Sequence, residues 1–291
     1  MSFLRDLWAV GRPCFWPVSL LPYYLGFVLA THRLVPSWAQ FPAVAAGAVV
    51  IGPLLWLSVL AVNDAHDLHG DRLNPRKAGT PLTSGRMSVT TARQIAGVAG
   101  LTAVAVATTV GLAFAAGTLL AVVVGWLYSA PPARLKARAG ADVAVNAIAL
   151  GVLGPVAGWI VVRPVAGFPW VVAALGVLVG AALYLPTTLA DLRADRASGY
   201  ATIAVRLGPS RTRRWGMAAW TAAAALSIVL AAADEVIPRR MLVLELVMAP
   251  VLVAAYPRLA RTERSFRGVV VLASLFLIPS VTFALSYTGV W

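Results

Sequence analysis

Acidic side chains are scarce in this sequence, and nearly half of them fall in two short stretches. The 291 residues include 11 aspartates and glutamates, among them Asp64, Asp67 and Asp71 in one stretch and Asp191 and Asp195 in the other. Spacings of three and four residues place side chains on one face of a helix, where like charges repel each other. If these stretches are helical, both clusters need a positive partner.

Magnesium is the partner that the chemistry of these side chains favours. Mg²⁺ prefers oxygen ligands and typically takes one or two carboxylates together with phosphate oxygens of a substrate. Two facing clusters could hold a diphosphate between them, with nearby basic side chains supplying further positive charge. Those basic residues are Arg72, Arg76, Lys77, Arg134 and Lys136. The pattern predicts that a diphosphate departs, stabilised by metal and cations, and leaves an allylic carbocation.

The composition predicts that this chain lies in a bilayer. Hydrophobic residues make up 60% of the sequence and charged residues only 12%, too few for the surface of a soluble domain. A membrane-spanning helix takes about 20 apolar residues, and such runs recur along the chain. We expect an all-α membrane protein in which residues 1–291 form a single bundle around a central cavity. The nine expected helices span about 14–30, 41–62, 92–114, 116–130, 142–162, 168–189, 215–233, 241–256 and 268–288.

One boundary depends on a tight turn. The third and fourth of these helices share one long apolar stretch, and we expect the chain to turn around Gly117, since glycine is a frequent breaker of such runs. The two longest and most polar connections, 63–91 and 190–214, are expected to cap the bundle on one side. Long loops on a rigid scaffold are where function usually lies.

Basic residues provide an independent test of this topology. A net charge of +13 would suggest a nucleic-acid partner for a soluble protein, but the positive-inside rule explains it without one. The expected helices place all but four of the 24 lysines and arginines on the side that holds the N-terminus. The exceptions are Arg33, Arg163, Arg239 and Arg240. We therefore expect a cytoplasmic N-terminus, cytoplasmic long loops and an external C-terminus, an arrangement that requires an odd number of helices.

The interior of such a bundle could hold a long isoprenoid chain. Four aromatic residues near expected helix ends, Trp56, Trp126, Tyr128 and Tyr184, could stabilise a cation through their rings. Tryptophan and tyrosine also gather at membrane interfaces because their rings are amphipathic. Both roles remain open for these residues.

Two motifs at a matching separation carry a resemblance to a known family. Asn63-Asp64-x-x-Asp67-x-x-x-Asp71 and Asp191-x-x-x-Asp195 resemble the two motifs of the UbiA superfamily of intramembrane prenyltransferases. The similarity extends over nearly the whole chain. Further similar positions are Arg12-Pro13, the stretch from Tyr128 to Lys136, Asn146, Gly199, Thr202 and Val205-Arg206-Leu207-Gly208.

The resemblance implies a function and the residues that carry it. The five aspartates would coordinate Mg²⁺, and the enzyme would ionise a prenyl diphosphate. The prenyl group would pass to an aromatic ring, a quinone precursor or another lipophilic acceptor, within the lipids of a bacterial cell membrane. The residues assigned to substrate binding are Arg12, Asn63, Arg72, Lys77, Tyr128, Arg134, Lys136, Asn146 and Tyr184.

The sequence also departs from the family pattern. Many members carry a basic residue before the Pro-Leu of the first loop, where this chain has Thr80. The missing phosphate contact could come from Arg76 or Arg86. His66 and His69 stand where aromatic residues are common, and they could act as a general base or be solvated loop residues.

Two other functions remain open from the sequence. Some members of the superfamily are terpene cyclases, which use the same ionisation to start an intramolecular reaction without an acceptor. The lining of the pocket decides between transfer and cyclisation, and the sequence does not reveal it. Acidic residues in a membrane protein also occur in cation transporters, although here they lie at helix ends beside basic residues.

Overall fold

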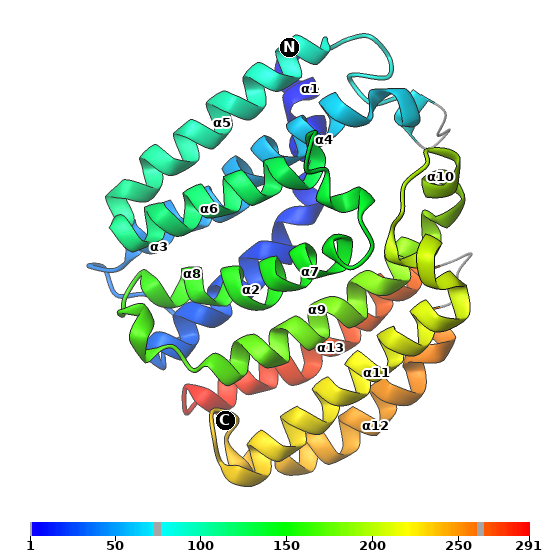
Figure 1. Ribbon diagram of the computed structural model, residues 1–291. Helices are drawn as coiled ribbons and strands as arrows, with labels where there is room; N and C mark the ends of the chain where they lie inside the picture. Colours follow the sequence, from blue (N-terminus) through cyan, green and yellow to red (C-terminus); the bar gives the residue numbers. More distant parts are fainter. Residues whose placement is uncertain (1, 73–76, 261–264) are drawn as a thin grey trace.

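The computed structural model describes residues 2–72, 77–260 and 265–291, and it is built of helices (Figure 1). Within these residues nine helical segments are long and apolar enough to cross a membrane, which confirms the expected number. They are Phe3–Thr31, Phe41–Arg72, Val89–Val110, Leu112–Ser129, Ala141–Ile160, Trp170–Ala190, Ile203–Ala233, Arg239–Leu259 and Arg267–Tyr287.

Three of these segments join shorter helices. The first segment contains α1 (Ser2–Gly11), a 3₁₀ turn (Pro13–Phe15) and α2 (Trp16–Thr31). The second contains α3 (Phe41–Val49), a π turn (Val50–Leu54) and α4 (Leu55–Arg72). The fifth contains α7 (Ala141–Ile148), a π turn (Ala149–Leu153) and α8 (Gly154–Ile160). Proline lacks an N–H and clashes with the preceding turn. Pro53 lies within one π turn, and Pro155 is the second residue of α8, which follows the other, so the wider turn lets the chain pass each proline.

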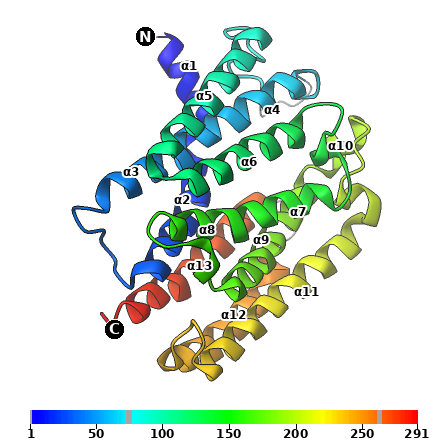
Figure 2. The same cartoon turned by 60° about the vertical axis from the view of Figure 1, so that its left-hand side comes forward.

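The other spans are single helices. They are α5 (Val89–Val110), α6 (Leu112–Ser129), α9 (Trp170–Ala190), α11 (Ile203–Ala233), α12 (Leu242–Leu259) and α13 (Ser265–Tyr287). A short helix, α10 (Leu192–Ala197), lies between α9 and α11, and further 3₁₀ turns are Leu135–Ala137, Val165–Gly167 and Arg239–Met241. In both ribbon views α10 lies at the same end of the bundle as the α6–α7 connection and the C-terminal end of α4 (Figures 1 and 2).

The helices pack in two main groups around a central pair. On one side α4, α5 and α6 contact one another, and on the other α9 contacts α11 and α13, while α11 also contacts α12. The central pair, α2 and α8, pack closely together, and α7 joins them to α9. The segments that hold the two aspartate motifs, α4 and α9–α10, therefore belong to different groups of helices.

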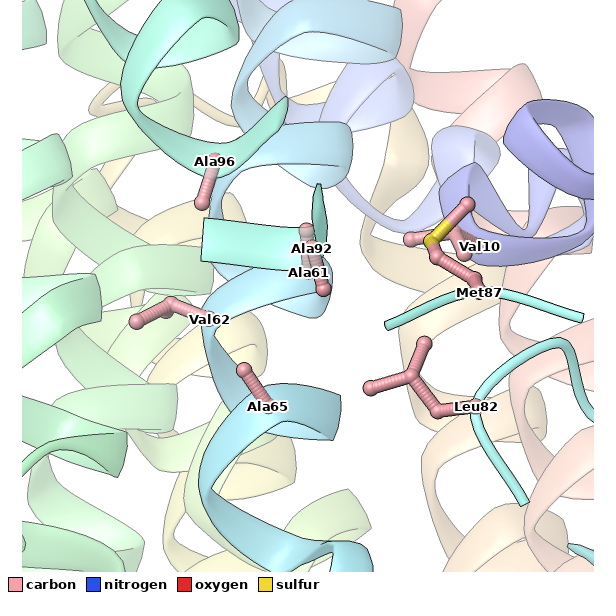
Figure 3. Packing of buried hydrophobic residues seen from close by; sticks show 8 residues of the cluster. All are labelled: Val10, Ala61, Val62, Ala65, Leu82, Met87, Ala92 and Ala96. Atoms are coloured by element: carbon pink, nitrogen blue, oxygen red, sulfur yellow. The ribbon is translucent and has the colours of Figure 1, made fainter. Parts of the chain in front are cut away.

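A buried apolar cluster fixes the position of the aspartate-bearing end of α4 (Figure 3). Ala61, Val62 and Ala65 of α4 are buried, and the cluster also includes Val10 of α1, Leu82 and Met87 of the α4–α5 connection, and Ala92 and Ala96 of α5. Small alanine side chains allow close helix packing. The cluster holds one face of α4 against α1 and α5, which leaves another face for the polar side chains.

Three expected boundaries are wrong. The turn between the third and fourth spans lies at Gly111, not at Gly117, which lies inside α6. The backbone of Gly111 has φ 153°, in a region that favours glycine. Helix α4 continues ten residues into the expected loop 63–91. Helix α11 begins at Ile203 rather than at 215, with a kink at Gly208, where φ is 75°.

Glycines permit the close approach of α2 and α8. A Cβ atom added to Gly158 would lie 1.7 Å from the backbone oxygen of Tyr23, whereas one added to Gly97 of α5 would meet nothing within 4 Å. Gly158→Ala should therefore force the helices apart and lower the free energy of unfolding by about 2 kcal/mol or more. Thermal unfolding in detergent measures the loss.

Gly97→Ala is the matched control, because the same methyl group is added within a helix. It should be neutral or slightly stabilising, since alanine restricts the unfolded chain. Equal melting temperatures for the two variants would contradict the close packing of α2 against α8.

Candidate active site

Asp64 and Asp71 of α4 each contact a basic side chain from another segment. Arg12 Nη2 donates to Asp64 Oδ1 at 2.6 Å, and Lys77 Nζ donates to Asp71 Oδ1 at 2.7 Å. Asp64 and Asp71 are 4% and 8% exposed, so these ion pairs are largely shielded from water. A buried carboxylate without such a partner would be costly. The cations thus offset the like-charge repulsion that the spacing of the motif predicts.

Asp67 lies between these two residues on α4 and contacts two cations. Lys136 Nζ donates to Asp67 Oδ2 at 2.5 Å, and Arg134 Nη2 donates to Asp67 Oδ1 at 3.2 Å. Lys136 also donates to Asn63 Oδ1 at 2.8 Å, and Ser129 Oγ donates to the same oxygen at 3.2 Å. Burial lowers the pKa of Lys136, and the charge of Asp67 opposes that shift. The α6–α7 connection thus brings its basic residues onto the first motif.

Arg134 links the first motif to the segment that follows the second. Its Nη2 donates to the backbone oxygen of His66 at 3.2 Å and to the hydroxyl of Tyr200. Its guanidinium carbon lies 4.8 Å from the centre of the Tyr200 ring, within the range of cation–π attraction. In the part of the chain that the structure describes, Arg134 Nε is buried and has no hydrogen-bond partner. Arg134 therefore retains a donor that a ligand could use.

The second motif lies close to the first. Asp191 caps the C-terminus of α9 and Asp195 lies in α10, where Thr202 Oγ1 donates to Asp195 Oδ2 at 3.0 Å. The pKa of Asp195 is raised to about 6, mainly by burial and further by the charges of Asp191, Asp142 and Asp67. A Cβ atom added to Gly70 of α4 would lie 3.5 Å from Ser198 Oγ, directly after α10, so the segments that hold the two motifs lie side by side.

Tyr200, which was not predicted as a site residue, connects these motifs. Its backbone N donates to the backbone oxygen of Asp195 at 2.9 Å, and its hydroxyl lies 3.4 Å from Asp67 Oδ1. Burial raises the pKa of its hydroxyl, so the phenol stays protonated and can donate. The sequence signal that could have identified Tyr200 was its neighbour Gly199, which matches a position of the family pattern. A tyrosine in a polar loop does not by itself predict that contact.

Asp142, at the start of α7, is a second residue that the sequence analysis missed. It is 1% exposed, and its two carboxylate oxygens accept hydrogen bonds from the backbone N of Gly140 and Ile203, each at 2.8 Å. Ile203 begins α11, directly after the loop that holds Thr202. Asp142 therefore ties the second motif to the α6–α7 connection.

Asp142→Ala should lower the free energy of unfolding by about 2 kcal/mol, because it leaves two backbone donors without their acceptor. Asp142→Asn keeps one acceptor oxygen and should lose less. Thermal unfolding of both variants in one detergent provides the measurement. A melting temperature for Asp142→Ala equal to that of the parent protein would contradict the tie.

Tyr128, Tyr184 and Asn146 form a polar group between α6, α9 and α7. The two tyrosine hydroxyls lie 2.6 Å apart, and Asn146 Nδ2 donates to the hydroxyl of Tyr128 at 3.0 Å. The two predicted tryptophans have other partners: Trp56 Nε1 donates to Ser19 Oγ and Trp126 Nε1 to Ser58 Oγ. The structure thus brings three of the predicted substrate-binding residues together.

Other predicted phosphate contacts are not brought together. Arg72 is exposed at the end of α4, and Arg76 lies outside the described residues. Arg86 Nε donates to Asp6 Oδ1 at 2.9 Å and Nη2 to the backbone oxygen of Gly79 at 3.2 Å, so it ties α1 to the α4–α5 connection. Thr80 takes part in hydrogen bonds within that connection.

The two histidines differ in their surroundings. His69 is exposed, whereas His66 is half-buried and its Nδ1 lies 2.8 Å from the backbone oxygen of Val62. That oxygen only accepts, so Nδ1 carries the hydrogen and Nε2 of the neutral ring is an acceptor. No metal site of three or more His, Cys, Asp or Glu side chains is formed within residues 2–72, 77–260 and 265–291.

The donor set nevertheless fits a magnesium ion that shares its ligands with a substrate. Mg²⁺ needs only one or two protein carboxylates when phosphate oxygens complete its octahedron. The first motif offers carboxylates balanced by basic side chains, and Asp195, whose pKa is raised mainly by burial, is also repelled by the charges of Asp191 and Asp67. A divalent cation would relieve that repulsion.

Comparison with known proteins gives partial sequence relatives and whole-length structural ones. Homogentisate phytyltransferase from Synechocystis sp. is 30% identical over 139 residues, covering 47% of this chain and 44% of that protein. The bacteriochlorophyll synthase 33 kDa chain from Rhodobacter capsulatus is 31% identical over 132 residues, covering 45% and 42%. The matches therefore span less than half the length of these relatives.

A UbiA homologue from Archaeoglobus fulgidus, solved bound to GPP and Mg²⁺, has the same fold. Its TM-score is 0.74 at 22% identity, and the match covers 98% of this chain and 99% of that one. The sequence pattern of the UbiA prenyltransferase family matches residues 19–267. Together with the nine apolar spans of the described residues, this match makes the chain an integral, multi-pass membrane protein that belongs to the UbiA prenyltransferase family.

Proposed function

We propose that this protein is a magnesium-dependent prenyltransferase, which ionises a prenyl diphosphate and transfers the prenyl group to a lipophilic acceptor. The observation that carries the proposal is the meeting of the two aspartate motifs and the basic α6–α7 connection. Lys136 and Arg134 contact Asp67, and Tyr200 contacts both Asp67 and the backbone of Asp195. These groups provide both signs of charge that a metal–diphosphate complex requires.

In this proposal Asp64, Asp67, Asp71, Asp191 and Asp195 would hold Mg²⁺. When bound, the metal supplies positive charge against the oxygens of the departing diphosphate. Three basic side chains contact these aspartates in the structure, namely Lys77, Arg134 and Lys136. When the substrate binds, they would turn toward its phosphate oxygens. The unpaired Nε of Arg134 gives that side chain a donor for this purpose.

The polar group at Tyr128, Tyr184 and Asn146 would lie beside the reacting carbon. Each tyrosine presents an aromatic ring, and its hydroxyl is held by a hydrogen bond, because the two hydroxyl oxygens lie 2.6 Å apart. Held rings can stabilise an allylic cation without reorganising. Their fixed positions would also exclude water, which otherwise captures the cation.

Transfer is favoured over cyclisation by the relatives. One relative is named as a phytyltransferase that acts on homogentisate and another as a bacteriochlorophyll synthase, and a structural neighbour was solved with GPP and Mg²⁺. These names support a prenyl diphosphate and an acceptor for this chain. By the positive-inside rule we also infer that the aspartate end faces the cytoplasm and the C-terminus lies outside a bacterial cell membrane.

Purified protein supplied with Mg²⁺ and prenyl diphosphates of several lengths tests the proposal. We expect diphosphate release and a prenylated product when a lipophilic aromatic acceptor is added, and neither after EDTA treatment. A cyclic terpene formed in the absence of an acceptor would indicate that the enzyme catalyses cyclisation and not transfer. Intact prenyl diphosphate under every condition would contradict the proposal altogether.

A further inference from the structure

A hollow of about 430 Å³ opens at the end of the bundle opposite the aspartates. It lies where α2, α8 and α13 end and where α9 and α12 begin, away from α10 (Figure 2). Its lining combines apolar and basic side chains, among them Leu29, Trp159, His32, Arg163 and Arg240. The proposed prenyl transfer uses none of these residues.

Two of the four basic residues that the topology places on this side line this hollow. Arg163 and Arg240 line it, and Arg163 and Arg33 line a second hollow of about 320 Å³ beside it. Arg239 donates its backbone N to Asp234, another residue of the first hollow. Basic residues are uncommon on this side by the positive-inside rule. Their concentration in one place therefore calls for a local cause.

Contacts hold the two arginines of the larger hollow in place. Arg240 Nε donates to Ser286 Oγ at 2.7 Å and Nη2 to the backbone oxygen of Ser286, while the guanidinium of Arg163 lies 5.6 Å from the ring of Trp159. In the described part of the chain, no ion pair joins either arginine to a carboxylate. Asp234 is the acid in the lining, and its Oδ1 accepts from Arg239 N at 2.7 Å.

His32 adds a third polar group to the same hollow. Its ring stacks on Tyr287 with ring centres 4.3 Å apart and planes inclined by 12°, and its Nδ1 lies 3.4 Å from the backbone oxygen of Tyr287. The stack joins the end of α2 to the end of α13. The lining of the hollow thus combines the guanidinium groups of Arg163 and Arg240 with apolar side chains.

We propose that this hollow binds a phosphate group, either that of an anionic lipid headgroup or free phosphate. Arginine is suited to phosphate because its planar fork donates two hydrogen bonds at once. Pro169, Val236 and Pro238, which are half-buried residues of the lining, provide apolar surface of the kind that meets the glycerol and first acyl carbons of a lipid. Arg163, in the α8–α9 connection, and Arg240, in the 3₁₀ turn before α12, line the same hollow and would contact the phosphate from two segments.

Native mass spectrometry of the full-length protein tests this site. Delipidated protein in a neutral detergent is titrated with phosphatidylglycerol or with phosphatidylcholine. We expect preferential retention of phosphatidylglycerol, reduced about tenfold in Arg240→Gln and in Arg163→Gln through loss of a charge-assisted hydrogen bond. Arg239→Gln is the matched control, because it removes the same charge at the neighbouring position and should retain the lipid.

Inorganic phosphate distinguishes the two sources of the ligand. Displacement of the lipid by phosphate would assign the site to the phosphate group alone, and retention of the lipid would assign it to the whole headgroup. Arg163→Gln provides a second variant if loss of the Ser286 contact unfolds Arg240→Gln, and circular dichroism checks both. Equal retention of phosphatidylglycerol by Arg163→Gln and the parent protein would overturn the proposal.

Discussion

Asp67→Asn is expected to lower the rate of diphosphate release by about 10³-fold, near the upper end of the loss when one group that stabilises developing charge is removed. Asp67 is the aspartate that contacts both Lys136 and Arg134 and lies near the hydroxyl of Tyr200. Asparagine has nearly the same shape but carries no charge. The substitution therefore removes a proposed metal ligand and leaves two cations without their partner.

The measurement is release of diphosphate from a prenyl diphosphate under saturating Mg²⁺. Asp234→Asn serves as the control, because it removes a carboxylate at the opposite end of the bundle, where Asp234 accepts from the backbone of Arg239. Circular dichroism and gel filtration verify that both variants remain folded. If Asp67→Asn turns over substrate about as fast as Asp234→Asn, Asp67 takes no part in the reaction.

Lys136→Gln is expected to lower the maximal rate about 10²-fold, since it removes a cation that would stabilise charge developing on the diphosphate. Lys136 contacts Asp67 at 2.5 Å and Asn63 at 2.8 Å, so its charge already lies at the first motif. Its effect should fall mainly on kcat, because the charge on the bridging oxygen grows in the transition state.

Arg138→Gln is the matched control for Lys136→Gln. Arg138 lies two residues away, is exposed and donates to the backbone oxygen of Pro132. Steady-state kinetics of the two variants over a range of prenyl diphosphate concentrations separates kcat from KM. Equal losses in the two variants would indicate a general effect of surface charge rather than a contact of Lys136 with the diphosphate.

The arrangement of the first motif was predictable because it is local. Once α4 continues past residue 62, the spacing of Asp64, Asp67 and Asp71 determines that they share a face. Hydrophobic runs likewise predicted nine spans, because the length of each run must match the bilayer. The position of the turn at Gly111 was missed, since Gly111 and Gly117 lie in one apolar stretch and hydropathy does not distinguish them.

The residues that join the two motifs were not predictable in this way. Asp142 accepts from the backbone N of Ile203, 61 positions away, and no local pattern signals such a contact. Tyr200 meets Asp67, 133 positions away, only because the loop after α10 lies beside α4. Arg86 was considered for the phosphate site, but its pairing with Asp6 depends on how α1 packs against the connection.

The central claim is that both aspartate motifs hold one metal–diphosphate complex. Electron paramagnetic resonance of the protein with Mn²⁺ in place of Mg²⁺ and an unreactive prenyl thiodiphosphate tests it most directly, because ³¹P hyperfine coupling reports phosphate bound to the metal. We predict a coupling in the parent protein that is lost in both Asp67→Asn and Asp191→Asn. A coupling that persists when either motif is altered would contradict the claim.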